Sequence, residues 1–184
     1  MPKLLIVHGT TRPSRTGILV SRAFESRANE ATDFDVDLAD LKEINLPFLD
    51  ELDHPRAGNY RLPHTLEWAK RVEAADAIVW ATPQYNGSFS APLKNAIDFL
   101  SAEWVGKPLG LLSWGGKSGG LDAANALRPI AAVLQMPVIE PIVGYVNYFA
   151  DLNDDGTLTP TAEWTEAAKR LLTSLEESVE KNAA

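Results

Sequence analysis

The sequence predicts an α/β protein in which five parallel strands form one sheet with helices on both faces. Strand patterns and helix patterns alternate along the chain, and such alternation is typical of parallel strands joined by right-handed crossovers. In addition, three loops of unusual composition follow strands, at 9–17, 83–88 and 113–120. Because the carboxyl ends of parallel strands lie at the same edge of a sheet, we expect a ligand site where these loops meet.

The first half of the chain alternates clearly between the two kinds of element. An apolar run within 3–9 predicts a buried strand, and helical spacing of apolar residues predicts a helix over about 17–30. Apolar and polar residues alternate over 34–41, which predicts a strand with one wet face near a sheet edge. Prolines and a glycine within 42–62 indicate a long irregular loop, which is followed by a helix that ends near residue 75.

The second half begins with a continuous apolar run at 77–82, which predicts a central strand covered on both faces. Ser90 is placed to cap the next helix, whose apolar stripe runs from Leu93 to Leu100. The remaining predicted elements are a buried strand at 109–113, a helix at 124–134, a short fifth strand at 138–140, an irregular segment at 141–158, and a terminal helix with apolar residues from 164 to 179.

Composition restricts the possible functions. The chain has 184 residues, which predicts a single domain over 1–184, and its net charge of −8 argues against binding nucleic acid or an anionic membrane surface. It contains no cysteine, so disulfides and thiol chemistry are excluded. No apolar run is long enough to span a membrane and no signal-peptide pattern is visible, so we expect a cytoplasmic location.

The first loop combines hydroxyl groups with two arginines. It connects a predicted strand to the start of a predicted helix, where unpaired N–H groups and a partial positive charge favour an anion. Arginine adds a full charge and forked donors that suit phosphate. We interpret this loop as a phosphate pocket; the alternative is an ordinary capped helix with two solvated arginines. The side chains concerned are Thr10, Thr11, Arg12, Ser14, Arg15 and Thr16.

Three familiar motifs are incomplete in this sequence. The glycine-rich dinucleotide fingerprint is absent, because only Gly9 precedes Arg12. Leu111 occupies the position of the first glycine of a P-loop, and a calcium-like run that begins at Asp151 has Ala162 in place of the bidentate glutamate. The three histidines are not at metal-ligand spacings, so we predict no metal site.

The three loops together suit flavin mononucleotide (FMN). This cofactor has a phosphate for the first loop, a polar ribityl chain, and a flat ring that needs close approach of the backbone. Gly87, Gly115 and Gly116 permit that approach because they have no Cβ, and Tyr85 or Trp114 is placed to flank the ring. In the alternative interpretation the glycines serve only tight turns and the aromatic residues belong to the core.

With these loops the sequence resembles a known family, the NADPH-dependent FMN reductases of the flavodoxin-like fold. The resemblance rests on three motifs in the same order as in the family. They read Gly-Thr-Thr-Arg-Pro-Ser-Arg-Thr-Gly over 9–17, Pro-Gln-Tyr-Asn over 83–86, and Ser-Trp-Gly-Gly-Lys-Ser-Gly-Gly over 113–120. Gln84 departs from the pattern, because the family usually has glutamate there; the amide is expected to alter either a subunit contact or a ring-edge contact.

The resemblance implies a flavodoxin-like three-layer sandwich with strand order 2-1-3-4-5. It also implies which residues bind FMN, and it assigns no catalytic side chain because FMN carries the chemistry. The implied phosphate ligands are Thr10, Arg12, Arg15, Thr16 and Gly17. The ring and ribityl chain are expected against Pro83, Gln84, Tyr85, Asn86 and Gly87 on one side and Ser113, Gly115 and Gly116 on the other.

The implied activity is transfer of electrons from NADPH or NADH through FMN to a quinone-like acceptor, another small acceptor or free flavin. A homodimer or homotetramer formed through the helix at 93–100 is also implied, and Trp104 is expected as an exposed aromatic residue consistent with it. One alternative is a flavodoxin-like electron carrier without its own NAD(P)H turnover, against which Arg12 and Arg15 weigh. A nucleotide-binding protein without flavin is the other.

Overall fold

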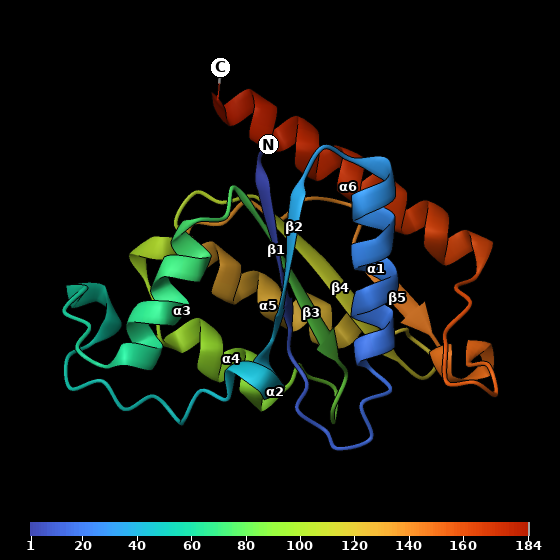
Figure 1. Ribbon diagram of the computed structural model, residues 1–184, viewed down its shortest axis with the longest axis horizontal. Coiled ribbons are helices and arrows are strands. Elements are labelled where there is room, and N and C mark those ends of the chain that lie inside the picture. Colours follow the sequence, from blue (N-terminus) through green and yellow to red (C-terminus); the bar gives the residue numbers. More distant parts are fainter. Residues whose placement is uncertain (184) are drawn as a thin grey trace.

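The computed structural model describes residues 1–183 and contains one five-stranded sheet whose paired strands are all parallel (Figure 1). The strand order is β2-β1-β3-β4-β5, which confirms the predicted topology. Every residue of β3, in the middle of the sheet, is buried, whereas β2 lies at an edge and begins with an exposed residue. The strands are β1 (Lys3–His8), β2 (Asp35–Asp40), β3 (Ala77–Pro83), β4 (Leu109–Gly115) and β5 (Val143–Val146).

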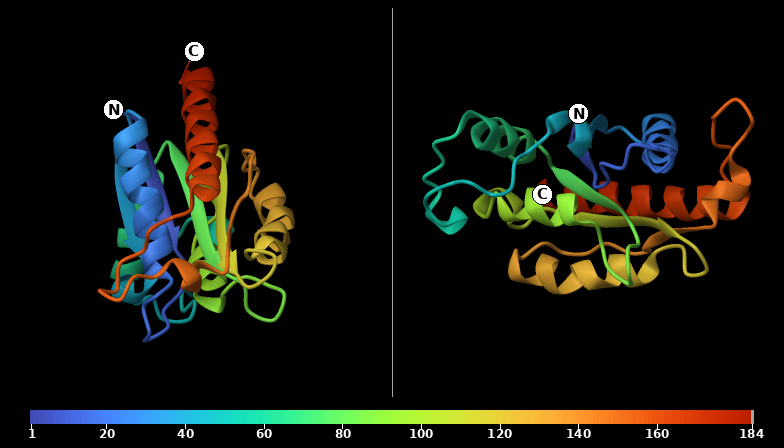
Figure 2. Two further views of the ribbon diagram at one scale, coloured as in Figure 1. Left: turned by 90° about the vertical axis from the view of Figure 1, so that its right-hand side faces the viewer. Right: turned by 90° about the horizontal axis from the view of Figure 1, so that it is seen from below.

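The helices lie in two layers, one on each face of the sheet (Figure 2). The core on one face is built with α1 and α6, and the core on the other face with α3, α4 and α5. Within residues 1–183 no helix is long and apolar enough to cross a membrane. The helices are α1 (Ile18–Ala31), α2 (Leu41–Ile44), α3 (Pro63–Glu73), α4 (Ala91–Asp98), α5 (Leu121–Val133) and α6 (Ala162–Ala183), with short 3₁₀ turns at Pro55–Ala57, Ala102–Trp104 and Tyr148–Asp151.

Three tryptophans anchor the core beneath α3, α4 and α5. The ring of Trp104 packs edge-on against Trp68 and Trp80, with centroid distances of 6.1 and 5.8 Å. Its indole N–H donates a hydrogen bond of 3.1 Å to the carbonyl of Ile97. Trp104 is therefore fully buried, and the expectation that it is exposed at a subunit surface is wrong. A hydrogen-bonded indole inside a core buries a large apolar area, which explains its position.

The fifth strand lies later in the sequence than expected. The predicted strand at 138–140 makes only an isolated bridge, between Val138 and Leu109, in which the Ile139 amide donates to the carbonyl of Leu109. Pro141 then interrupts the ladder, because proline has no N–H to donate. Regular pairing with β4 begins only at Val143, inside the segment that the sequence predicted to be irregular.

Candidate functional site

A pocket opens at the carboxyl edge of the sheet, where all three unusual loops contribute residues. We call it the carboxyl-edge pocket; its volume is about 90 Å³. The first loop, the end of β3 with the loop that follows, and β4 form three of its sides, and the 3₁₀ turn after β5 forms the fourth. It is lined by Thr10, Arg12, Ser14, Arg15, Thr16, Gly17, Pro83, Gln84, Tyr85, Trp114, Tyr148 and Phe149.

The residues predicted to bind FMN fall into two groups. Those of the first loop, together with Pro83, Gln84 and Tyr85, line the carboxyl-edge pocket. The others lie outside it: Ser113 is buried and donates its hydroxyl to the carbonyl of Gly119 at 3.0 Å. Asn86, Gly87, Gly115 and Gly116 form two loop tips beside the pocket, and a Cβ added at Gly87 or Gly116 meets no atom within 4 Å.

Two pairs of hydroxyl groups join the walls of the pocket. Thr10 Oγ1 and Tyr85 Oη lie 3.1 Å apart, which connects the first loop to the loop after β3. Thr16 Oγ1 and Tyr148 Oη lie 3.0 Å apart and connect the first loop to the turn after β5. The sequence reasoning missed Tyr148 and Phe149, because both lie in the segment interpreted as irregular. Two adjacent aromatic residues just beyond a strand were the available signal.

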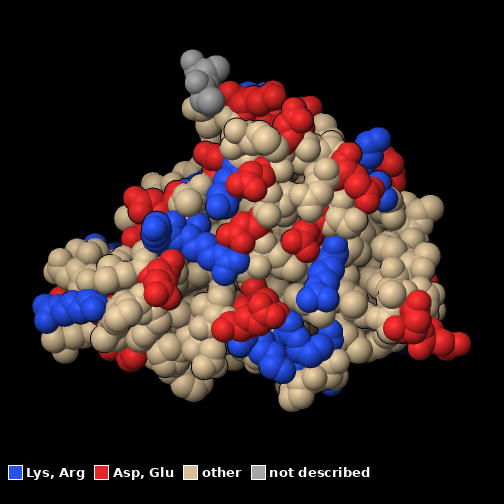
Figure 3. Space-filling model, viewed as in Figure 1, with Lys and Arg blue, Asp and Glu red and all other residues tan. Residues whose placement is uncertain are grey.

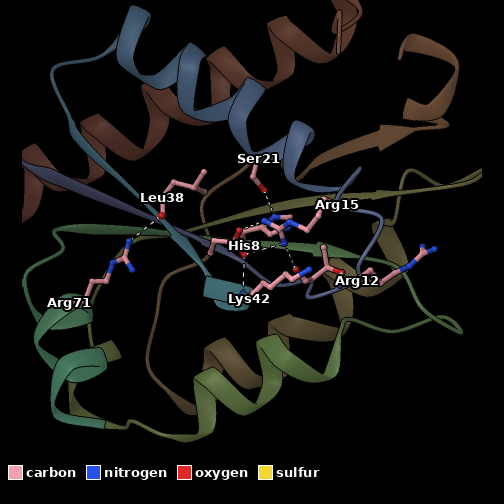
Figure 4. Close-up of polar contacts among 9 residues, drawn as sticks. His8, Arg12, Arg15, Ser21, Leu38, Lys42 and Arg71 are labelled. Carbon is pink, nitrogen blue, oxygen red and sulfur yellow. Dashed lines mark hydrogen bonds and ion pairs between the residues drawn. The ribbon is translucent and has the colours of Figure 1, made fainter. Parts of the chain in front are cut away.

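The two arginines of the first loop differ in their partners. The Arg15 guanidinium forms an ion pair with Asp40 at the end of β2 and also donates to the carbonyl of Thr10 at 3.4 Å. In Figure 4 the labelled Arg12 and Arg15 side chains extend in different directions from the first loop. Within residues 1–183 the exposed Arg12 side chain forms no ion pair. Arg12 is therefore the arginine whose charge is available to a ligand.

The start of α1 offers further donors to an anion. Its N-cap residue is Gly17, and no side chain caps the helix. Among the hydrogen bonds formed within residues 1–183, none uses the backbone N–H of Thr16 or Gly17 as the donor. These amides lie at the start of a 14-residue helix, where the helix dipole is positive. Free N–H groups at such a position favour binding of an anionic group.

The glycine at position 17 is required by packing. A Cβ built there would lie 2.9 Å from Cζ2 of Trp114, which is too close for a carbon–carbon contact. The ring of His8 is stacked with the Trp114 indole, at a centroid distance of 5.5 Å and an interplanar angle of 4°. The indole thus forms a fixed wall of the pocket, directly against the start of α1.

His8 is neutral in this environment. Its Nδ1 lies 2.8 Å from the hydroxyl of Ser21, and its Nε2 has no partner within residues 1–183. Burial lowers the pKa of His8 from 6.5 to about 4, although the nearby carboxylate of Asp40 partly opposes this shift. A neutral imidazole under Trp114 adds no positive charge to the pocket, so Arg12 and the helix start supply it.

Ser90 has a different role from the predicted cap. It occupies the N-cap position of α4, but its side chain makes no capping hydrogen bond. Its hydroxyl instead donates to the carbonyl of Gly9 at the start of the first loop. A Cβ at Gly9 would lie 2.8 Å from the carbonyl oxygen of Ala81, so only glycine allows this close approach.

Figure 3 shows a basic patch at the lower edge of the molecule, on the side where the strands end, with acidic side chains directly above it. The molecule as a whole carries a net charge of −8. A local positive field in an acidic protein favours a small anionic ligand over a long polyanion. The pocket can therefore hold a phosphate group, with aromatic walls beside it.

Comparisons with known proteins agree with this geometry. The sequence matches the family profile described as NADPH-dependent FMN reductase over residues 2–151. An NAD(P)H-dependent FMN reductase of Schizosaccharomyces pombe is 36% identical over 166 residues, which cover 89% of this chain and 82% of the relative. An NAD(P)H:quinone oxidoreductase of Solanum tuberosum is 33% identical over 148 residues, which cover 77% of this chain and 74% of that protein.

Solved structures share the architecture at low sequence identity. A flavoenzyme NAD(P)H:(acceptor) oxidoreductase from Paracoccus denitrificans has a TM-score of 0.78 and 19% identity, with 98% of each chain covered. An archaeal flavodoxin has a TM-score of 0.64 and 16% identity, with 98% of this chain and 99% of the flavodoxin covered. At these identities the likeness concerns the fold alone, and it confirms the predicted flavodoxin-like sandwich.

Proposed function

The chain belongs to the NADPH-dependent FMN reductase family, and from this premise we propose that it is an FMN-dependent NAD(P)H oxidoreductase. It passes electrons from NADPH or NADH through FMN to a quinone-like or other small acceptor, or to free flavin. The observation that carries the proposal is the carboxyl-edge pocket, where an arginine without an ion pair and an uncapped helix start lie beside aromatic walls.

The donor set of the first loop suits the phosphate of FMN. Arg12 would supply a charge and a forked pair of donors, and the hydroxyls of Thr10 and Thr16 would supply neutral ones. The amides of Thr16 and Gly17 would complete the cradle at the start of α1. Arg15 lies at the same loop with its charge paired to Asp40, so we assign it to holding the loop in place.

The ring of FMN would lie over the two loop tips. Asn86 and Gly87 have positive φ angles of 49° and 79°, which turn the chain sharply after β3. Gly116 has open space where a side chain would stand, so the backbone there would approach a planar ring. Pro83, Gln84 and Tyr85 would line one side, and Gly115 the other; the buried Ser113 would support the second tip from below.

Bound FMN would supply the redox chemistry, which is hydride transfer from NADPH or NADH and electron transfer to the acceptor. The chain's own contribution is position and electrostatics. Hydroxyls, amides and Arg12 hold the phosphate, the Trp114 and Tyr148 side chains close the pocket behind it, and the exposed tips leave the far side open to the two substrates in turn. We assign no side chain to proton transfer or covalent chemistry.

An absorbance spectrum tests the proposal directly. Purified protein with added FMN is expected to show a bound-flavin spectrum that bleaches within seconds after anaerobic addition of NADPH or NADH, and a quinone should restore the colour. Flavin that binds but keeps its colour with both nicotinamides would indicate an electron carrier. Failure to bind FMN would contradict the proposal as a whole.

We also propose a homodimer or homotetramer formed through α4, in the cytoplasm, where NADPH and NADH are available. A cavity of about 510 Å³ lies beside α4 and α5 and is lined by apolar side chains that include Ile97, Leu100 and Val133. Val133 is 65% exposed in the single chain, and covering it would remove apolar surface from water. Light scattering of Val133→Asp against the unchanged protein tests this interface, and an unchanged mass would contradict it.

A further inference from the structure

A second and larger cavity lies on the other side of the first loop from the carboxyl-edge pocket. Its volume is about 530 Å³, within the size range of small-molecule sites. Thr11 lines it from the first loop, residues within 41–48 form one wall, and the first turns of α4 form the other. Thr10 and Arg12 line the carboxyl-edge pocket. A single stretch of backbone therefore separates the two sites.

The walls of this second cavity are held in place by hydrogen bonds. The Asn95 side-chain amide donates to the carbonyl of Pro47 at 2.7 Å and accepts from the amide of Leu49 at 3.0 Å. These bonds tie the loop after α2 to α4. The cavity is consequently a built feature of the fold, with apolar walls at Leu46, Pro47 and Pro92.

Lys42 is the cationic side chain that lines the second cavity. It is exposed, and within residues 1–183 its ammonium group forms no ion pair. In Figure 4 the side chain extends from α2 toward the first loop. The charge of Lys42 is thus free to act on a ligand.

The position of Lys42 is coupled to the first loop through one carboxylate. Asp40, only 6% exposed, pairs with Arg15 on one side and accepts the backbone N–H of Lys42 at 3.0 Å on the other. The same side chain therefore anchors the predicted phosphate loop and the start of α2. This arrangement fixes the backbone of Lys42 at the start of α2 relative to the first loop.

We infer that the second cavity binds the adenosine end of the nicotinamide cofactor and that Lys42 contacts the 2′-phosphate of NADPH. Apolar and proline walls suit a flat base, and an unpaired ammonium beside them suits a phosphate. NADH carries a hydroxyl in place of that phosphate, so the contact favours NADPH. The inference rests on the proposed function, because it assumes that the nicotinamide reaches a flavin beyond the first loop.

Coenzyme kinetics provide the first test. In Lys42→Ala the ratio of KM for NADPH to KM for NADH is expected to rise about tenfold, since a charged contact to phosphate is lost. Lys42→Arg should restore most of the difference, and Lys42→Glu should raise the ratio further. Lys169→Ala, an exposed lysine on α6, is the matched control. A ratio that stays at the wild-type value in Lys42→Ala and Lys42→Glu would overturn the inference.

Direct binding separates this inference from the proposed function. We would titrate adenosine 2′,5′-bisphosphate and adenosine 5′-monophosphate into FMN-saturated protein by calorimetry. The bisphosphate is expected to bind more tightly than the monophosphate, and Lys42→Ala should weaken only the bisphosphate, by about tenfold. Equal binding of the two nucleotides would overturn the inference even if NADPH bleaches the flavin. Selective binding without bleaching would support this site and contradict the proposed electron transfer.

Discussion

Gln84 Nε2 donates a hydrogen bond of 3.1 Å to Asp122 Oδ2, which joins the loop after β3 to the first turn of α5. The hydroxyl of Ser118 donates to the other end of the same amide, Oε1, at 3.3 Å. Gln84 thus bridges the two loop tips proposed to hold the FMN ring. A glutamate at this position, as is usual in the family, would place a second carboxylate against Asp122. The amide and this aspartate are therefore complementary.

The first prediction concerns this pair. Gln84→Glu should weaken FMN binding about three- to tenfold, because the donor is lost and two carboxylates face each other. Adding Asp122→Asn should recover most of the loss, and a double-mutant cycle of FMN affinities should show a coupling of about 1 kcal/mol. Quenching of flavin fluorescence measures these affinities. Additive effects of the two changes would contradict the proposed complementarity.

A second prediction addresses the free arginine. Arg12→Ala should raise the Kd for FMN by about 10- to 100-fold, because charge-assisted hydrogen bonds to phosphate are lost. Riboflavin, which has no phosphate, should bind both proteins equally. Arg170→Ala, on the exposed side of α6, serves as the control. If Arg12→Ala weakened riboflavin and FMN to the same extent, the phosphate assignment would be wrong.

A third prediction follows from the contact between Gly17 and Trp114. Gly17→Ala should lower the free energy of unfolding by about 1–3 kcal/mol, because the added methyl group meets the buried indole of Trp114. Urea denaturation measures the change. Gly116→Ala is the matched control, since its added Cβ meets no atom within 4 Å. Equal stability of the two variants would show that Trp114 moves aside freely.

The fourth prediction separates the two roles of Asp40. Asp40→Asn removes the partner of the Arg15 charge but keeps an oxygen for the Lys42 amide, and we expect a loss of about 1–3 kcal/mol in stability. Asp40→Ala should cost about 1 kcal/mol more, because the cap of α2 is lost as well. Arg15 is 26% exposed, which places the expected loss below that of a fully buried pair. Wild-type stability of Asp40→Asn in urea would argue against an anchoring role.

The fifth prediction is a dependence of stability on pH. In the unfolded chain the imidazole of His8 takes up a proton near pH 6.5, whereas in the folded protein it does so only near pH 4. Burial of neutral His8 therefore carries no protonation penalty above about pH 6.5. As the pH falls from 6.5 toward 4, the unfolded chain binds a proton that the folded protein does not, and the free energy of unfolding drops by roughly 3 kcal/mol. His8→Gln cannot titrate in this range.

Carboxylates also titrate in this range, so the test compares the pH dependence of stability in the unchanged protein with that in His8→Gln. Denaturation curves of the unchanged protein and of His8→Gln, measured at intervals from pH 7.5 to 4, should diverge in slope below about pH 6.5. The unchanged protein should lose stability faster. Parallel curves would show that His8 is not held neutral by burial.

Sequence patterns alone were enough to predict the architecture and the edge of the sheet at which the three loops meet. Apolar runs such as 77–82 form central strands because only residues without polar side chains can be covered on both faces, and alternation with helices makes the sheet parallel. The loops that follow parallel strands lie at one edge of the sheet, and the pocket at that edge is lined by residues from the loops at 9–17, 83–88 and 113–120. Strand order and the edge at which loops gather can be predicted because they depend on local pattern and on topology.

Which side chains face one another depends on the packing of elements that are far apart in the sequence. Arg12 and Arg15 look equivalent in sequence, yet Asp40, 25 residues beyond Arg15, pairs with one and leaves the other free. Trp104 turned out to be buried, β5 starts after Pro141, and Tyr148 reaches Thr16 across 132 residues. Partners so distant along the chain are chosen by packing and by charge compensation in three dimensions, and no local pattern encodes them.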